Sequence, residues 1–285
     1  SDSVLDTPTN NYATLNGICG RDGYFAEFSD ANLHTHLVNG SYYQFAVATQ
    51  GITSGKYYWE VTVDDAAASG DATRAVISLF DMDTSDQNGF PDYNGRFYFK
   101  DGEKKVTDDG SGSKVSYGDS FDDGDVIGVA LDMSAGTLTM YKNGSTQGVL
   151  DNTMLSKCPD SGWFPGCYGY SSSNFTFNFG QQPFTHTPPT GHVHLCTANA
   201  PTPIIKDPSK HFNTVLYTGN GGSSQTITGL DFSPDFVWFK ERSGTQNHMV
   251  FDTVRGVEES LWPNDVWAEE AYSGEGVSAF NSNGV

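Results

Sequence analysis

The chain has 285 residues, with 35 acidic and 15 basic side chains, and its formal net charge is −20 at pH 7. Such a charge repels nucleic acid and anionic lipid, so we expect neither a nucleic-acid partner nor membrane insertion. The sequence shows no apolar run of about 18 residues and no basic, apolar leader, which excludes a membrane span and a signal peptide and favours synthesis in a cytoplasm.

The composition predicts an all-β protein of short strands and tight turns. The chain contains 32 glycines, its aromatic content is 13%, and apolar residues rarely follow a helical period. Its length is sufficient for two domains of ordinary size.

Candidate strands in the first half of the chain show alternating apolar residues. In 55–63, Tyr57, Trp59, Val61 and Val63 share one parity, which predicts that they face a core. Many short strands with one apolar face each predict a sandwich of two antiparallel sheets. The other candidates are 42–49, 74–80, 96–100 and 174–180.

The stretch 122–144 predicts a β-meander. Ile127, Val129 and Leu131 share one face with Leu138 and Met140, whereas Thr137, Thr139 and Tyr141 take the opposite face. Residues 134–136 form the first turn, and Asn143-Gly144 is a strong signal for a second, because a type I′ turn needs positive φ at both central positions.

The sequence predicts three parts. A β-sandwich covers 1–184, a proline-rich linker with no strand alternation covers 185–210, and a second β domain covers 211–285. The second domain has few residues and stops after a turn signal, so we expect an incomplete β-sandwich from a longer polypeptide.

Three ordered motifs resemble the SPRY domain: SGKYYWEVTV, GDVIGVALDMSAGTLTMYKNG and WFPGCYGYSSSNFTFNFGQQPF. The resemblance covers roughly 10–184. It implies a curved, concanavalin-like antiparallel β-sandwich that recognises partners through its loops, and it implies no catalysis.

The flanking segments LDTPTNNYATLN, FGQQPFTHTPPTGHVHLCTAN and GLDFSPDFVWFKERSGTQNHMVFDTVRG resemble SPRY-containing virion proteins of tailed, mostly marine, bacteriophages. This resemblance implies a tail-fibre or capsid-fibre component located in the virion, with a second concanavalin-like domain at its end. It implies host attachment or particle decoration, contacts with a host-surface glycan or protein and with other virion subunits, and a homo-oligomer, with a trimer favoured.

The loop 81–96 is the part of the first domain that is richest in polar chemistry, and we predict that it contacts the ligand. Its carboxylates and amides can bond hydroxyl groups while its aromatic rings stack on a sugar or fill a protein pocket. Calcium is an alternative, but Asp86 stands where an EF-hand loop needs glycine and no bidentate Glu closes the loop, so we predict no cofactor. The predicted ligand-binding residues here are Asp83, Asp86, Asn88, Phe90, Asp92 and Tyr93.

Tyr168 and Tyr170 share a parity before the last predicted strand, and we predict that they extend this contact surface as an exposed rim. No catalytic residues are predicted. Glu60 has no acidic neighbour two residues away, unlike the paired acids of a jelly-roll glycosidase, and is expected to face solvent. A polysaccharide-degrading jelly-roll enzyme and a structural spacer without a ligand remain the alternatives.

The histidines and cysteines predict no metal centre. His192, His194 and Cys196 lie on one side of an extended stretch, with the spacing of a soft-metal site, but no fourth ligand is apparent. The four cysteines are unevenly spaced and contain no C-x-x-C pair. Free buried thiols are therefore favoured, and a Cys158–Cys167 cross-link is the alternative.

Overall fold

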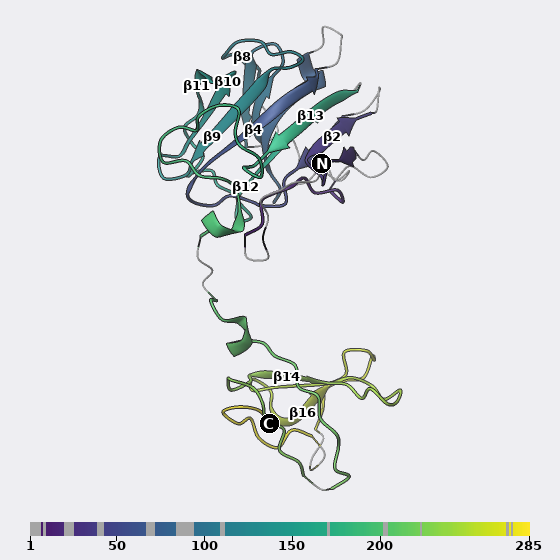
Figure 1. The fold of residues 1–285 in the computed structure, drawn as a ribbon. Helices are drawn as coiled ribbons and strands as arrows, with labels where there is room; N and C mark the ends of the chain where they lie inside the picture. The colour runs from purple at the N-terminus through teal and green to yellow at the C-terminus, as the bar shows by residue number, and fades with distance from the viewer. Residues whose placement is uncertain are drawn as a thin grey trace. The chain divides into compact units, whose positions relative to one another are not determined.

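The computed structural model of the chain is shown in Figure 1. It describes residues 7, 10–19, 26–38, 43–66, 72–83, 94–108, 112–169, 172–201, 205–222, 224–271, 274 and 276–285. The chain divides into two compact units, Ser1–Pro201 and Thr202–Val285.

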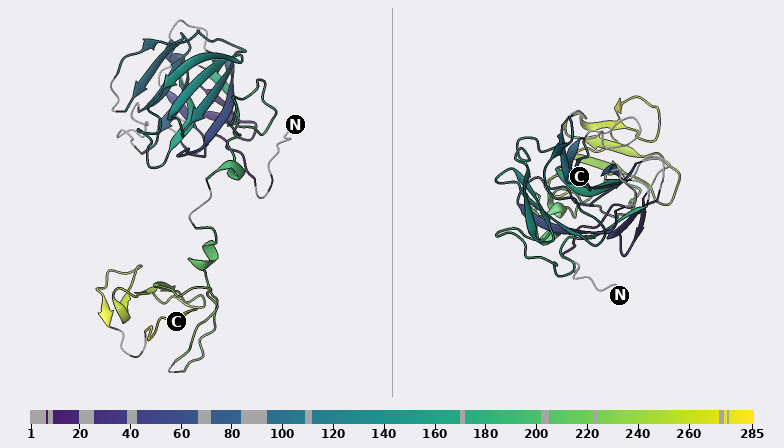
Figure 2. Two further views of the ribbon diagram at one scale, coloured as in Figure 1. Left: turned by 90° about the vertical axis from the view of Figure 1, so that its left-hand side faces the viewer. Right: turned by 90° about the horizontal axis from the view of Figure 1, so that it is seen from above.

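Two antiparallel sheets build the first unit in the part of the chain that the structure describes, and Figure 2 shows them as two curved layers. Sheet A has the strand order β1-β2-β13-β4-β9-β10-β11, and sheet B has the order β3-β12-β5-β6-β7-β8. The strands of sheet A are β1 (Glu27–Ser29), β2 (His34–Leu37), β13 (Ser173–Asn178), β4 (Lys56–Asp65), β9 (Val126–Asp132), β10 (Thr137–Lys142) and β11 (Ser145–Asp151). Those of sheet B are β3 (Gln44–Val47), β12 (Trp163–Gly169), β5 (Ala75–Asp81), β6 (Gly95–Phe99), β7 (Glu103–Thr107) and β8 (Val115–Ser116).

The main core lies between the two sheets and follows the predicted alternation. Trp59, Val61 and Val63 of β4 are fully buried, and Phe175 and Phe177 of β13 lie beside them. This confirms the predicted antiparallel sandwich, because each strand of an inner layer buries one parity of its side chains.

The predicted β-meander is confirmed together with its register. Val129 pairs with Met140 and Leu131 pairs with Leu138, and all four side chains are buried. The second turn has φ values of 47° at Asn143 and 79° at Gly144, as a type I′ turn requires. Asn is one of the few side-chain-bearing residues that adopt this conformation readily, and glycine does so without a steric penalty.

Sheet B is apolar on both faces. Its outer face carries an aromatic cluster that is separate from the main core and contains Phe45, Val47, Val76, Phe80, Phe97 and Phe99. Partly buried Tyr43, Phe164 and Tyr168 pack against this cluster. Strands buried on both faces lose the polar–apolar alternation, which explains the dense aromatic content of β6 and β12.

The segment 184–196, called the strap below, packs against β4 on the outer face of sheet A. The ring of Phe184 lies 5.0 Å from that of Tyr58, and the Val193 N–H donates to the Lys56 carbonyl at 3.0 Å. Leu195 and Cys196 are buried. The structure therefore differs from the predicted linker over 185–210, because 185–201 belong to the first unit. A proline has no backbone N–H to donate to a strand ladder, but it does not prevent a segment from packing against a sheet.

Glu60 lies beneath the strap and is only 2% exposed, so the prediction that it faces solvent is wrong. Its side chain does point away from the main core, as the parity of β4 requires. The strap covers this side of the sheet and converts an outward position into a buried one.

The end of the strap and the residue that follows it pair with residues near the start of the chain. The Ala13 N–H donates to the Leu195 carbonyl at 3.0 Å, and the Thr197 N–H donates to the Asn11 carbonyl at 2.9 Å. Tyr12 and Cys196 lie between them as an antiparallel bridge. The first unit thus has its entering and leaving segments side by side.

The described part of the second unit contains one antiparallel sheet, sheet C, in the order β14-β15-β16-β17. Its strands are β14 (Phe236–Phe239), β15 (Met249–Asp252), β16 (Gly256–Leu261) and β17 (Glu270–Ala271). The apolar side chains buried there are Val250, Phe251, Trp262 and Val277. The concanavalin-like nature of this unit stays a prediction.

Helical structure in the described residues is limited to three 3-10 turns, η1 (Ala72–Arg74), η2 (Thr197–Asn199) and η3 (Pro208–Lys210). No helix of this described part is long and apolar enough to cross a membrane.

Candidate binding cleft

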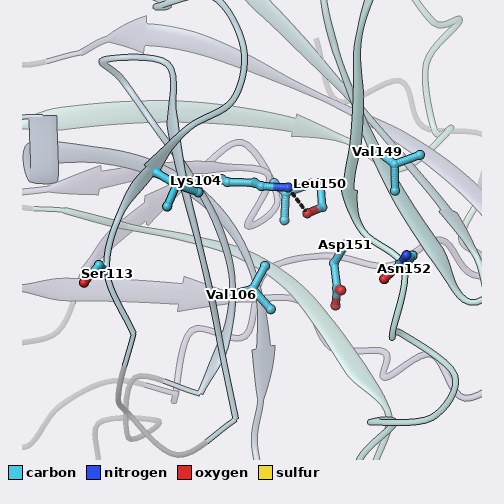
Figure 3. Close-up of a pocket in the computed structure, with 8 residues that line it drawn as sticks. Lys104, Val106, Ser113, Val149, Leu150, Asp151 and Asn152 are labelled. Atoms are coloured by element: carbon cyan, nitrogen blue, oxygen red, sulfur yellow. Dashed lines mark hydrogen bonds between the residues drawn. The ribbon is translucent and has the colours of Figure 1, made fainter.

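A cleft lies at the open side of the sandwich, where the edge strands of the two sheets come together. Strand β11 ends sheet A, and β8 ends sheet B next to β7. The cavity has a volume of about 460 Å³. Figure 3 shows its lining residues: Lys104, Val106, Ser113, Val115, Val149, Leu150, Asp151 and Asn152.

Three hydrogen bonds tie β11 to β7 and to the segment that follows β8. Lys104 Nζ donates to the Leu150 carbonyl at 2.6 Å, as the dashed line in Figure 3 shows, and Tyr117 Oη donates to the Gly148 carbonyl at 2.5 Å. The Asp119 N–H donates to Gln147 Oε1 at 2.7 Å. Two carbonyls of this edge strand are thereby satisfied by side chains, which restrains the edge from pairing with another strand.

The Tyr117 hydroxyl donates one of these hydrogen bonds, and its pKa is raised. Burial is the main cause that raises the pKa of Tyr117 to about 12. Lys104 Nζ also lies 5.0 Å from the centre of the Tyr117 ring, within the range of a cation–π contact. The phenol therefore stays protonated, and able to donate to Gly148, up to a higher pH than an ordinary tyrosine.

The walls of the cleft are apolar at the rim. Val115 is 50% exposed and Val149 is 49% exposed, whereas Leu150, deeper in the cleft, is 1% exposed. Val149 pairs with Thr139 and shares its outer face of sheet A, whereas Val115 pairs with Lys104 and shares its face of sheet B. Each half-exposed valine can lose water to an apolar group of a partner that covers this edge of the sandwich.

The polar floor of the cleft is a buried ion network. Asp151 accepts a hydrogen bond from Arg96 Nε, and Arg96 is fully buried. The Arg96 guanidinium lies 4.4 Å from the centre of the Trp163 ring and forms a second ion pair, of 2.8 Å, with Asp108. Asp151 also accepts bonds from the N–H and hydroxyl of Thr153. The Asp151 carboxylate thus accepts bonds from Arg96 and Thr153, and these bonds stabilise the end of β11.

Of the residues predicted from the sequence to contact the ligand, the structure describes Asp83 and Tyr168, and neither lines the cleft. Asp83 accepts a hydrogen bond from the Ser161 N–H at 3.1 Å, next to the start of β12. Bonds from Ser161 lower the pKa of Asp83. Asp86, Asn88, Phe90, Asp92, Tyr93 and Tyr170 lie outside the described residues.

Tyr168 is half-buried and not part of an exposed rim. Its ring packs edge-on against Phe97 at 5.5 Å and Tyr43 at 5.8 Å in the outer cluster of sheet B. In the pairing of β5 with β12, Trp163 is opposite Asp81, and Tyr168 is opposite Val76. Asp83 and Tyr168 are therefore at opposite ends of β12, roughly 17 Å apart at the usual rise of a strand.

The described residues contain no group of three His, Cys, Asp or Glu side chains that could hold a metal ion. In the strap, the His194 ring lies 5.1 Å from that of Phe184, and Cys196 accepts a bond from Asn199 Nδ2 at 3.3 Å. The four cysteines are free thiols, and burial raises the pKa of Cys167.

Sequence reasoning missed the cleft. Lys104, Val115 and Val149 stand in short polar segments whose alternation is weak. Only the strand order shows that β8 and β11 are both edge strands on one side of the sandwich. The one signal in the sequence was an apolar residue in an otherwise polar strand, such as Val149 in β11.

Two family models match the chain. The model described as SPRY domain matches residues 56–182, and the one described as Domain of unknown function (DUF7483) matches residues 207–285. The cleft lies wholly within the first of these ranges.

Relatives were found among curated proteins and solved structures. The ATP-dependent RNA helicase DDX1 of Xenopus laevis is 28% identical over 179 residues, which are 63% of this chain and 21% of the helicase. The chain thus spans about a fifth of that protein, and the helicase activity in its name belongs to that relative. The SPRY domain of human HERC1 has a TM-score of 0.43 at 17% identity, covering 59% of this chain and 99% of that one. Stonustoxin has a TM-score of 0.42 at 15% identity, covering 59% of this chain and 27% of that one.

SPRY domains are protein-interaction modules and are generally not catalytic. The family match and the antiparallel sandwich agree with each other, and residues 56–182 of this chain are therefore a SPRY domain.

Proposed function

We propose that the SPRY domain is a protein-binding module and that the cleft between β7, β8 and β11 receives an apolar side chain of its partner. The observation that carries this proposal is that Val115 and Val149, on the two edge strands that border the cleft, are each half-exposed. Lys104 adds a cation at the same place, and its ammonium has donors beyond the one used by Leu150.

The finer proposal is that the module serves a tail fibre or capsid fibre of a tailed bacteriophage, in the virion, for attachment to the host or decoration of the particle. The resemblance of the flanking segments to phage virion proteins supports it. The partner is then a host-surface protein or glycan, or another virion subunit. A protein partner is favoured at the cleft, because sugar recognition usually relies on an exposed aromatic ring and none is among the described lining residues.

Binding of the full chain to bacterial cells, to their extracted surface polysaccharide and to their outer-membrane proteins tests this function. Val149→Asp combined with Val115→Asp should weaken binding at least about tenfold, since a carboxylate must be desolvated in the contact. Ile18→Asp is the matched control, because Ile18 is 89% exposed in the same unit and remote in sequence from the cleft.

Parallel variants in the loop 84–93 separate the two candidate surfaces. If Asp92→Ala and Tyr93→Ala abolish binding while the valine variant binds normally, the loop is the contact surface and the cleft proposal fails. If only polysaccharide is bound, the partner is a glycan. Either conclusion requires that the unfolding midpoint of every variant equals that of wild type.

The same proposal includes a homo-oligomer, with a trimer favoured. Large apolar side chains on the second unit support it: Leu216 is 76% exposed, Val254 93% and Val266 98%. Large apolar side chains that are this exposed are candidates for a contact between subunits. Sedimentation equilibrium of the chain at physiological salt should give an oligomer, and a monomer at micromolar concentration would exclude this part of the proposal.

A further inference from the structure

The second unit contains a cavity of about 480 Å³ beside β14. This volume is within the range of sites that hold small organic ligands. The walls are mainly aromatic and aliphatic, and the aromatic members are Phe212, Tyr217, Phe232, Phe236, Trp238 and Phe239. Such a lining favours an apolar chain or ring as the occupant.

The charges at this cavity have the opposite sign to the charge of the chain. Lys240 and Arg242 line it together with His211 and His248, and no Asp or Glu is among the described lining residues. Acidic residues alternate with the lining residues in the sequence, as Asp231, Asp235 and Glu241, yet they do not line the cavity. In a chain of net charge −20, a local cationic lining is complementary to an anion.

The cationic groups are available to a ligand. Arg242 forms no hydrogen bond or ion pair with any residue that the structure describes. Glu241, its neighbour, accepts a bond from the Ser243 hydroxyl at 3.0 Å instead. Lys240 Nζ donates to the Gln246 carbonyl at 2.8 Å and keeps further donors.

His248 contributes a hydrogen-bond donor, and its contact with Trp238 determines which ring nitrogen carries the proton. Trp238 Nε1 donates to His248 Nδ1 at 2.8 Å. An indole N–H only donates, so this Nδ1 carries no proton and the neutral ring carries its proton on Nε2. The lining therefore offers a guanidinium, an ammonium and an imidazole N–H, all of which are donors.

We propose that this cavity binds an amphipathic organic anion, with its apolar chain or ring against Trp238 and Phe236 and its carboxylate or sulfonate paired with Arg242. A guanidinium and a carboxylate form two parallel hydrogen bonds, which gives the strongest pairing available here. A neutral sugar fits less well, because it brings no charge to pair with Arg242 and Lys240 and little apolar surface for the aromatic walls. This site is separate from the cleft of the SPRY domain.

Calorimetric titration of the full chain with decanoate and with decanol tests the proposal. Wild type should bind decanoate at least about tenfold more tightly than decanol, and salt should weaken the binding of decanoate alone. Arg242→Gln should weaken decanoate binding about tenfold and leave decanol binding unchanged, whereas Trp238→Ala should weaken both. Lys206→Gln removes an equal charge from an exposed position outside the cavity and should change neither.

Circular dichroism and the unfolding midpoint establish that each variant is folded. The proposal is overturned if wild type does not bind decanoate, if decanol binds equally well, or if Lys206→Gln weakens decanoate binding as much as Arg242→Gln does. Binding that survives Trp238→Ala unchanged would also overturn it, because the apolar part would then lie elsewhere.

Discussion

Glu60 Oε1 accepts a hydrogen bond from the backbone N–H of His186 at 2.8 Å, and Oε2 accepts one from the N–H of Thr185 at 2.7 Å. One carboxylate on β4 thus holds the start of the strap through two consecutive amides. The Tyr58 hydroxyl adds a third bond, at 3.1 Å, and burial together with the Glu60 charge raises the pKa of Tyr58. Charge-assisted bonds of this kind are about twice as strong as neutral ones.

Replacing Glu60 by Gln should therefore destabilise the first unit by about 2–3 kcal/mol. Both carboxylate oxygens accept bonds from N–H groups, and the amide nitrogen of Gln would face one of these donors. Chemical denaturation measures the change. Glu27→Gln, on an exposed side chain, should lower the free energy of unfolding by less than about 0.5 kcal/mol. An equal decrease in both variants would show that the bonds from Thr185 and His186 to Glu60 do not stabilise the unit.

Removing one member of the buried pair beneath the cleft should be costlier. Asp151→Ala leaves the fully buried Arg96 without its main partner, and we expect a loss of about 3–5 kcal/mol in the free energy of unfolding. Asp108→Ala removes the second, half-exposed partner of the same guanidinium and should cost about 1 kcal/mol or less. A double-mutant cycle with Arg96→Met checks that the coupling belongs to the Arg96–Asp151 pair.

Acid should weaken the turn between β9 and β10 through Asp132. Burial opposes ionisation, but bonds from Lys56, from the Ser134 hydroxyl and from the Ala135 N–H outweigh it and lower the pKa of Asp132. An unfolded aspartate titrates near pH 4, so the unfolded state takes up the proton first as the pH falls. The stability contributed by Asp132 is complete above about pH 4 and is lost as the pH falls further towards the folded-state pKa.

Asp132→Asn should accordingly be less stable than wild type at pH 7, by about 1–2 kcal/mol. The difference between the two proteins should shrink below about pH 4, which denaturation curves from pH 7 to pH 2 would record. A difference that stays constant over this range would show that Asp132 acts through packing and not through its charge.

Gly180 sets the direction in which the chain enters the strap. Its φ is +114°, and a Cβ at this position would lie 2.5 Å from His194 Cγ. Gly180→Ala should therefore displace the strap and make residues 185–201 sensitive to limited proteolysis. Gly148→Ala is the matched control, because its φ of +85° brings the same backbone strain while its Cβ would meet nothing within 4 Å.

The alternation of apolar and polar residues correctly predicted the strands whose pairing partners lie nearby in the sequence. The pairing of Val129 with Met140 and the turn at Asn143 follow from a pattern within about 20 residues, and both are present in the structure. Glu60 was placed on the correct face of β4, yet its burial depends on Thr185 and His186, which lie 125 and 126 positions away in sequence. Parity determines where a side chain points, and it carries no information on what covers that side.

The cleft was missed for a related reason. Val149 has the pattern of an ordinary exposed strand residue, and its significance arises only because β11 and β8 are edge strands on the same side. Strand order is a global property that a single sequence expresses weakly. Tyr168 shows the opposite case. Glycines and serines near it in the sequence favoured an exposed rim, but its packing partners are Phe97 of β6 and Tyr43, which precedes β3.

The pairing of residues 11–13 with 195–197 determines how the first unit responds to tension. Because the two segments are antiparallel, a pull on residues 10 and 199 loads their hydrogen bonds one after another, as in opening a zipper, and not all at once. The bond from the Tyr57 hydroxyl to the Asn199 carbonyl, at 2.8 Å, would break with them, because it ties the pulled end to β4. The chain would then lengthen at this end of the unit before the strands of the two sheets carry the load.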